Sequence, residues 1–155
     1  MSLIAICGGG GKSTIFHKYP DFFIDIDNFV WSDSNKHYHN DIIDAIKRKD
    51  NKKLGVIYKK LLIKNKEILR NQNKIILAHH PSNAEWLEMD CLAILRPNEL
   101  LHRENISKRT EEMKRISIDS WKNLEGAHEY NTHKELEELL LSIKASYFES
   151  SRLQN

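Results

Sequence analysis

The sequence predicts an α/β fold of three layers, α/β/α, in which a central, mostly parallel five-stranded sheet lies between helices. Short apolar runs of strand length alternate along the chain with longer segments of helical periodicity. The first of these runs ends in a row of glycines that leads into a helical segment. Strands that alternate with helices join through right-handed crossovers, and these place helices on both faces of a parallel sheet.

Five segments are expected to form the strands. Four of them are apolar runs bounded by glycine, proline or polar residues, and the fifth is a shorter run near the C-terminal end. They cover residues 3–6, 21–27, 74–78, 91–95 and 128–131.

The segments between these strands are expected to be helical. The first helix should stop before Pro20, because the residue that precedes proline avoids helical angles. The last should begin at Thr132, where Glu135 three residues later completes a capping box. The expected helices cover residues 12–18, 40–49, 53–70, 83–88, 98–124 and 132–146.

Composition indicates a single cytoplasmic domain. Apolar residues make up 40% of the 155 residues and charged residues 30%, which is the balance of a soluble globular protein. No apolar run approaches the roughly 18 residues of a membrane span. Cys7 and Cys91 lie far apart in apolar runs and predict neither a disulfide framework nor a metal site. The net charge of +2 does not by itself indicate nucleic-acid binding.

A glycine run directly after the first strand is the strongest functional signal. Consecutive glycines let the backbone turn its N–H groups inward as an anion nest, and the next helix points its positive end at the same place. Lys12 is expected to reach the β- and γ-phosphates of ATP, and the Ser13 hydroxyl to ligate Mg²⁺. The predicted nucleotide-binding residues are Gly8, Gly9, Gly10, Gly11, Lys12, Ser13 and Thr14.

Two acids close the second predicted strand. Asp25 and Asp27 flank Ile26, and alternate residues of a strand face the same side. Both carboxylates should therefore meet at the carboxyl edge of the sheet, where open α/β folds bind ligands. Phosphoryl transfer to a hydroxyl needs one carboxylate to orient or deprotonate the acceptor, and it also needs a held metal ion. A solvated turn, or Asp27 acting as a helix cap, is the alternative.

The glycine run and the Asp25-Ile26-Asp27 sequence together resemble the P-loop kinase family, which includes shikimate, nucleoside monophosphate and polynucleotide kinases. The resemblance implies a P-loop NTPase fold over residues 1–155, with a helical acceptor-binding insert near 40–72 and a lid-like region at 98–124. It also implies that Asp25 supports Mg²⁺ and that Asp27 is the catalytic base.

The chain departs from the family pattern in three places. Ile6 stands where G-x-x-x-x-G-K-[ST] has its first glycine, and the helix before the second strand is several residues shorter than usual. The third strand ends in His79 and His80 without an acid, which leaves the metal to Ser13 and Asp25 and argues against a motor or regulatory NTPase. The two histidines could line an acceptor pocket or be loop histidines without a role.

The charged region after the fourth strand supplies candidate lid arginines. Arg103 and Arg109 are expected to neutralise the transferring phosphoryl group. They lie on different faces of a continuous helix, so the helix should break near residues 105–107. An ordinary solvated helix with acid–base pairs is the alternative.

The acceptor is indicated by a basic segment that follows three aromatic residues. Phe29, Trp31 and Tyr38 could stack on a base, and the cations after them could attract phosphate. The leading hypothesis is therefore a nucleotide or nucleic-acid kinase; a small-metabolite kinase, a nucleotide-binding module that acts through a partner, and a merely solvated basic face remain open. The cations are Lys47, Arg48, Lys49, Lys52, Lys53, Lys59, Lys60, Lys64, Lys66 and Arg70.

Overall fold

The computed structural model describes the backbone of residues 2–153 and the side chains of residues 2–150. It contains a five-stranded sheet whose order is β2-β3-β1-β4-β5, and every pair of neighbouring strands is parallel. The predicted parallel sheet is therefore confirmed. The strands are β1 (Ser2–Ile6), β2 (Phe23–Asp25), β3 (Ile75–Ala78), β4 (Asp90–Pro97) and β5 (His128–Tyr130).

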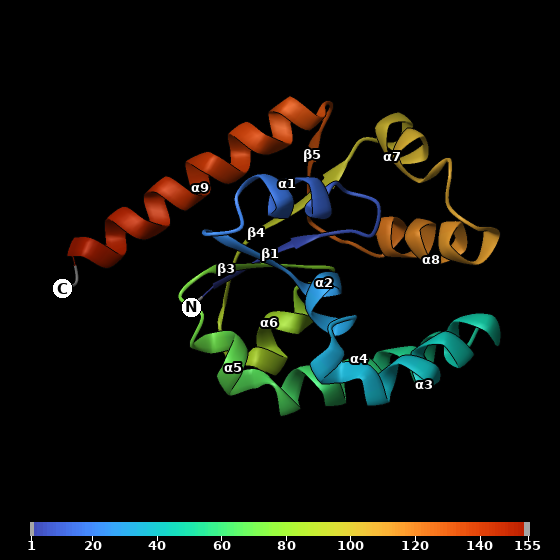
Figure 1. Cartoon of the computed structure of the whole chain (residues 1–155). Coiled ribbons are helices and arrows are strands. Elements are labelled where there is room, and N and C mark those ends of the chain that lie inside the picture. The colour runs from blue at the N-terminus through green and yellow to red at the C-terminus, as the bar shows by residue number, and fades with distance from the viewer. Residues whose placement is uncertain (1, 154–155) are drawn as a thin grey trace.

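Helices cover both faces of this sheet (Figure 1). One face carries α1 (Lys12–Lys18), α7 (Glu99–Ile106) and α9 (His133–Leu153). The other face carries a larger group, and α8 lies beside α3 within it. That group consists of α2 (Ile26–Val30), the 3-10 helix η1 (Asp33–Asn35), α3 (Lys36–Lys47), α4 (Asn51–Lys64), α5 (Lys66–Arg70), α6 (Ser82–Leu87) and α8 (Glu111–Lys122).

The central strand shows why the layers form. Side chains of β1 alternate between the two faces, and all of them are buried. Ile4 and Ile6 pack in the core under α1 and α9, whereas Leu3 and Ala5 pack in the core on the opposite face. A strand without a polar side can only be stable when both of its faces are covered, as in parallel sheets.

The order of the strands indicates where a ligand can bind at the edge of the sheet. From β1 the chain crosses through α1 to β2 on one side of β1, whereas from β4 it continues to β5 on the other side. The two connections therefore separate at the carboxyl ends of β1 and β4. Open parallel sheets bind their ligands at such a point.

Several predicted elements have different bounds in the structure; the helix expected over 53–70, for example, is divided into α4 and α5. Two of the differences lie near the glycine run of residues 8–11. The second strand ends at Asp25 rather than Asp27, because the Asp25 carboxylate accepts the Asp27 N–H (3.0 Å) and caps α2. The predicted helix 98–124 is divided into α7 and α8, and Thr110 caps the second of them by accepting the Met113 N–H (3.3 Å). The break thus falls a few residues after the expected position.

The start of α9 follows the capping prediction in part. The Thr132 hydroxyl accepts the Glu135 N–H at 3.0 Å, as a capping box requires. The Glu135 carboxylate accepts the N–H of Asn131 (3.1 Å) instead of the N–H of the cap residue. Over residues 2–153, the structure contains no helix that is both long and apolar enough to span a bilayer.

Candidate active site

The glycine loop, residues 8–11, leads from the end of β1 to the start of α1 and requires glycine at several positions. Gly9 and Gly11 have φ angles of 81° and 103°, in the left-handed region that favours glycine. At Gly10, an added Cβ would lie 2.3 Å from Cγ2 of Ile6. The Gly10 N–H donates to the Cys7 carbonyl (3.1 Å) and closes the turn.

Side chains of neighbouring elements donate hydrogen bonds to the carbonyls of this loop. From α7, His102 Nε2 donates to the Gly8 carbonyl (2.8 Å) and Asn105 Nδ2 donates to the Gly9 carbonyl (2.9 Å). From β5, the Tyr130 hydroxyl donates to the Gly10 carbonyl. Because these carbonyls already have hydrogen-bond partners, the groups of the loop that remain for an anion are backbone N–H groups, together with the first N–H groups of α1.

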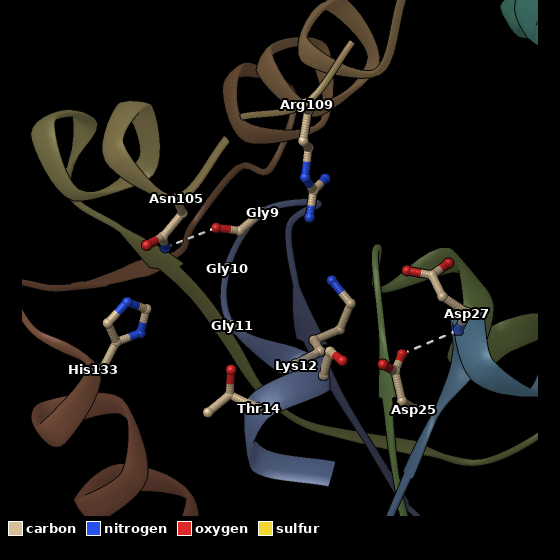
Figure 2. A pocket seen from close by; sticks show the side chains of 11 residues that line it. Gly9, Gly10, Gly11, Lys12, Thr14, Asp25, Asp27, Asn105, Arg109 and His133 are labelled. Atoms are coloured by element: carbon tan, nitrogen blue, oxygen red, sulfur yellow. Dashed lines mark hydrogen bonds between the residues drawn. The ribbon is translucent and has the colours of Figure 1, made fainter. Parts of the chain in front are cut away.

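Gly8 differs in position from the rest of the predicted cradle. Its N–H donates to the Ser120 hydroxyl (3.0 Å) in α8, so it does not point into the loop. A first cavity of about 300 Å³ lies inside the loop (Figure 2), and Gly8 is not part of its wall. The wall consists of Gly9, Gly10, Gly11, Lys12, Ser13, Thr14, Asp25, Asp27, Asn105, Arg109 and His133.

Lys12 is the first residue of α1 and is buried against the loop. Its ammonium donates to the carbonyls of Ile6 and Cys7, both at 2.9 Å. Burial lowers the pKa of Lys12, and the nearby carboxylates of Asp27 and Asp25 offset part of that effect. Figure 2 shows its side chain between the glycine loop and these two carboxylates. Lys12 is therefore a buried part of the wall of the first cavity.

Asp25 and Asp27 both line the first cavity, but not for the predicted reason. Asp25 ends β2, and Asp27 lies in the first turn of α2 rather than two positions along a strand. Burial raises the pKa of the Asp25 carboxyl, and the neighbouring Asp27 raises it further. The expected juxtaposition is therefore present, although a helix cap and not strand alternation produces it.

Asp27 contacts a histidine. Oδ1 of Asp27 lies 2.7 Å from Nε2 of His79, which follows the end of β3. Burial alone would raise the pKa of Asp27, but His79, Lys12 and Arg109 together lower it well below its usual range. Asp27 is therefore ionised at neutral pH, and its side chain, which lines the cavity, remains 40% exposed. An exposed carboxylate of this kind can accept a proton from a bound hydroxyl.

The two predicted arginines have different surroundings. Arg109 lies in the turn between α7 and α8, donates to the Ser117 hydroxyl (2.9 Å) and lines the first cavity. Arg103 lies on the exposed surface of α7, pairs with Glu99 at 3.4 Å and lines neither this cavity nor its neighbour. The structure therefore brings one of the two arginines to the site.

A second, larger cavity of about 530 Å³ adjoins the first. The two cavities share Asp27 and Arg109, so these side chains stand at the boundary between them. Both histidines after β3 line the second cavity, as does Trp31. Its remaining lining residues are Gly8, Ile46, Asn51, Leu54, Gly55, Tyr58, Met113, Ile116, Ser117, Asp119, Ser120 and Asn123.

The basic segment does not direct its charges into either cavity. Helix α4 contributes only Asn51, Leu54, Gly55 and Tyr58 to the second cavity, and none of the predicted cations is among its lining residues. Several of those cations pair on the surface instead: Arg48 and Lys53 with Asp44, and Lys66 with Glu88. Of the aromatic residues expected beside a base, Phe29 and Tyr38 pack against the core and only Trp31 reaches the cavity.

Sequence reasoning missed the residues that hold the loop and those that close the second cavity. His102 and Asn105 lie three apart on one helix face, a spacing visible in the sequence once a helix is assumed. Tyr58 and Ser120 carry no local signal, because only the packing of α4 and α8 around the sheet edge brings them to the site. Ser13 and Asp25 both line the first cavity, and both carry oxygen atoms, the ligand type that Mg²⁺ prefers.

Comparison with known proteins identifies a likeness of fold. No family model matches the chain, and no curated protein matches it either. The structure is similar to the unliganded crystal structure of a sugar kinase from Janibacter sp. HTCC2649, with a TM-score of 0.53 and 16% sequence identity. The match covers 91% of this chain and 91% of that one. At this identity the likeness shows that the two chains share a fold.

Proposed function

We propose that the protein is an ATP- and Mg²⁺-dependent kinase of the P-loop type that transfers the γ-phosphoryl group to an acceptor hydroxyl. One observation carries the proposal. A cavity lined by the glycine loop and Lys12 adjoins a second cavity, and the Asp27 carboxylate and Arg109 line both. A transferase needs this layout, because its two substrates must meet at the group that moves.

The residues of the first cavity would divide the binding of the nucleotide. The loop N–H groups and Lys12 would hold the phosphates. Ser13 and Asp25 would hold Mg²⁺, which when bound would neutralise charge on the phosphates. Arg109 would face the transferring group and stabilise its developing negative charge.

Asp27 would serve the acceptor from the boundary of the two cavities. The acceptor oxygen would attack the γ-phosphorus and form a new P–O bond, while the bond between that phosphorus and the β–γ bridging oxygen breaks and ADP leaves. The hydroxyl proton would pass to the Asp27 carboxylate, which is ionised and exposed toward the acceptor. His79 would hold the carboxylate in position.

Two acceptor classes suit this chemistry. The lysine-rich segment favours a nucleotide or nucleic acid, whereas the second cavity favours a small alcohol. Its volume lies within the roughly 300–1,000 Å³ of small-molecule sites, and none of the predicted lysines lines it. We therefore give the small acceptor the greater weight.

Acceptor-stimulated release of ADP tests the proposal. The chain would be incubated with ATP and Mg²⁺, and with pools of nucleosides, nucleoside monophosphates, 5′-hydroxyl oligonucleotides or sugars. The proposed function requires ADP release above the acceptor-free rate with at least one pool, and a phosphorylated product visible by mass spectrometry. Absence of stimulation by every pool would instead favour a nucleotide-binding module that acts through a partner.

A further inference from the structure

The second cavity contains little positive charge. Its charged lining residues are Asp27, Asp119 and Arg109, besides two histidines. Arg109 also lines the first cavity, where it would meet the transferring phosphoryl group. Arginine and lysine side chains are the usual partners of a phosphate or carboxylate, because they form charge-assisted hydrogen bonds, and this cavity contains no second one among the residues that the structure describes. The lining of this cavity therefore suits an acceptor without negative charge.

Another arginine, Arg115, lies behind the wall of the cavity, where Nη1 has partners and Nε and Nη2 are buried without a hydrogen-bond partner in the described part of the chain. Arg115 of α8 donates from Nη1 to Oδ1 of Asn51 at 3.2 Å and lies 3.7 Å from Oδ2 of Asp119. Both of these partners line the cavity, whereas Arg115 does not. Arg115 thus supports the wall and orients an amide and a carboxylate that can bond to hydroxyl groups of a ligand.

A glycine in the middle of α4 gives the cavity room. Gly55 lines the cavity, and nothing lies within 4 Å of the position that its Cβ would occupy. Glycine inside a helix is less stable than alanine by about 0.5–1 kcal/mol, and no close packing requires it at this position. The space above Gly55 is therefore open to a ligand.

Ring-bearing side chains border this space. Trp31 and Tyr58 line the cavity together with the apolar residues Ile46, Leu54 and Met113. Trp31 is 42% exposed, and the centroid of its ring lies 4.8 Å from that of the His39 ring. Aromatic and apolar walls of this kind bind flat rings and the apolar faces of sugars.

We propose that the second cavity binds an uncharged, ring-bearing alcohol, a nucleoside or a sugar, and excludes its phosphorylated counterpart, with Gly55 as the residue that admits the ring. The inference rests on the proposed kinase function for the role of Asp27, but the binding that it describes needs no ATP.

Calorimetry without nucleotide tests this selectivity. The probes are two matched pairs: thymidine with thymidine 5′-monophosphate, and glucose with glucose 6-phosphate. We expect at least one neutral compound to bind, and its phosphorylated partner to bind about tenfold more weakly or worse. The pair that responds distinguishes a nucleoside from a sugar. Equal or tighter binding of the phosphorylated member, or no binding of either neutral compound, would overturn the proposal.

Two variants locate the binding. Gly55→Phe should fill the cavity and lower the affinity for the neutral compound about tenfold or more, and its affinity for ATP should not change. Val56→Phe adds the same ring at the next position, which is exposed and outside the cavity, and should change neither affinity. Unchanged binding in Gly55→Phe would refute the assignment. Two outcomes separate the selectivity from the kinase proposal. Phosphorylation of a monophosphate would refute the selectivity and leave the kinase proposal intact. Binding of a neutral compound without any ADP release would support the selectivity and refute the kinase proposal.

Discussion

His79 Nε2 lies 2.7 Å from Asp27 Oδ1 and so joins the end of β3 to the first turn of α2. The contact is possible because β2 and β3 are adjacent and parallel, with Asp25 opposite Leu77, so that both chains leave the sheet at the same edge. The histidine contributes to the low pKa of Asp27 and also fixes one of its two carboxylate oxygens.

We predict that His79→Ala lowers kcat about 10- to 100-fold, because the carboxylate loses its fixed position, and that KM changes less. The variant should also move the acidic limb of the pH profile. Without His79 the pKa of Asp27 rises, so the base becomes protonated, and activity falls, at a higher pH than in the original chain.

Profiles of kcat/KM against pH measure this shift. His128→Ala, which removes an exposed histidine at the start of β5, is the matched control and should leave both the rate and the profile unchanged. His79→Gln, which keeps a donor, should recover part of the rate. An acidic limb that does not move in His79→Ala would show that the histidine has a purely structural role.

The two arginines predict a sharp contrast. Arg109→Ala should lower kcat about 10²-fold, since it removes a charged donor from the boundary of the two cavities. Arg103→Ala should change kcat less than about twofold, because its side chain forms only an exposed pair with Glu99. Steady-state kinetics on both variants test the contrast. Equal losses in the two variants would mean that α7 closes over the site during turnover.

Lys12 and Asp27 should separate nucleotide binding from transfer. Lys12→Ala should weaken ATP binding about 10- to 100-fold, the range for hydrogen bonds from a charged donor. Asp27→Asn should lower kcat by about 10²-fold or more and leave the affinity for ATP nearly unchanged. Calorimetry with ATP and Mg²⁺ gives the affinities, and the coupled ADP assay gives kcat. Full ATP affinity in Lys12→Ala would contradict the placement of the phosphates in the glycine loop.

The architecture could be predicted from sequence because local patterns determine it. Buried strands such as residues 3–6 are continuous apolar runs, and Thr132 with Glu135 identifies the start of α9. No local sequence pattern indicates the order of the strands in the sheet. That order depends on which apolar faces pack together across the whole chain, and so the neighbours of β1 become known only from the structure.

The site was predicted in part for the same reason. The glycine loop and Lys12 are contiguous, so one stretch of sequence contains most of the first cavity. The strand prediction for Asp27 was wrong, because Asp25 is followed by a helix that its own side chain caps. The second cavity is assembled from α2, α3, α4 and α8, and no sequence window contains the contact between Gly8 and Ser120.

We expect the buried carboxylate of Asp25 to lower the stability of the folded chain at neutral pH, although the proposed metal site needs it. This buried carboxyl has a raised pKa, so the folded chain holds this proton more tightly than the unfolded chain does. Stability is therefore lost as pH rises from the unfolded value of about 3.9 through the higher folded pKa. Asp25→Asn removes that loss, and its side-chain oxygen can still cap α2. The variant should be more stable than the original chain at pH 7.

This gain should shrink as pH falls and disappear below about pH 3.9, where the carboxyl is protonated in both states. Urea unfolding at a series of pH values measures it, with Asp21→Asn as an exposed control that should alter stability little. Activity should fall in Asp25→Asn, because a neutral amide is a poorer ligand for Mg²⁺ than a carboxylate. A variant that is less stable at pH 7 would contradict the buried, charged state of Asp25, whereas a stable variant with full activity would remove Asp25 from the metal site.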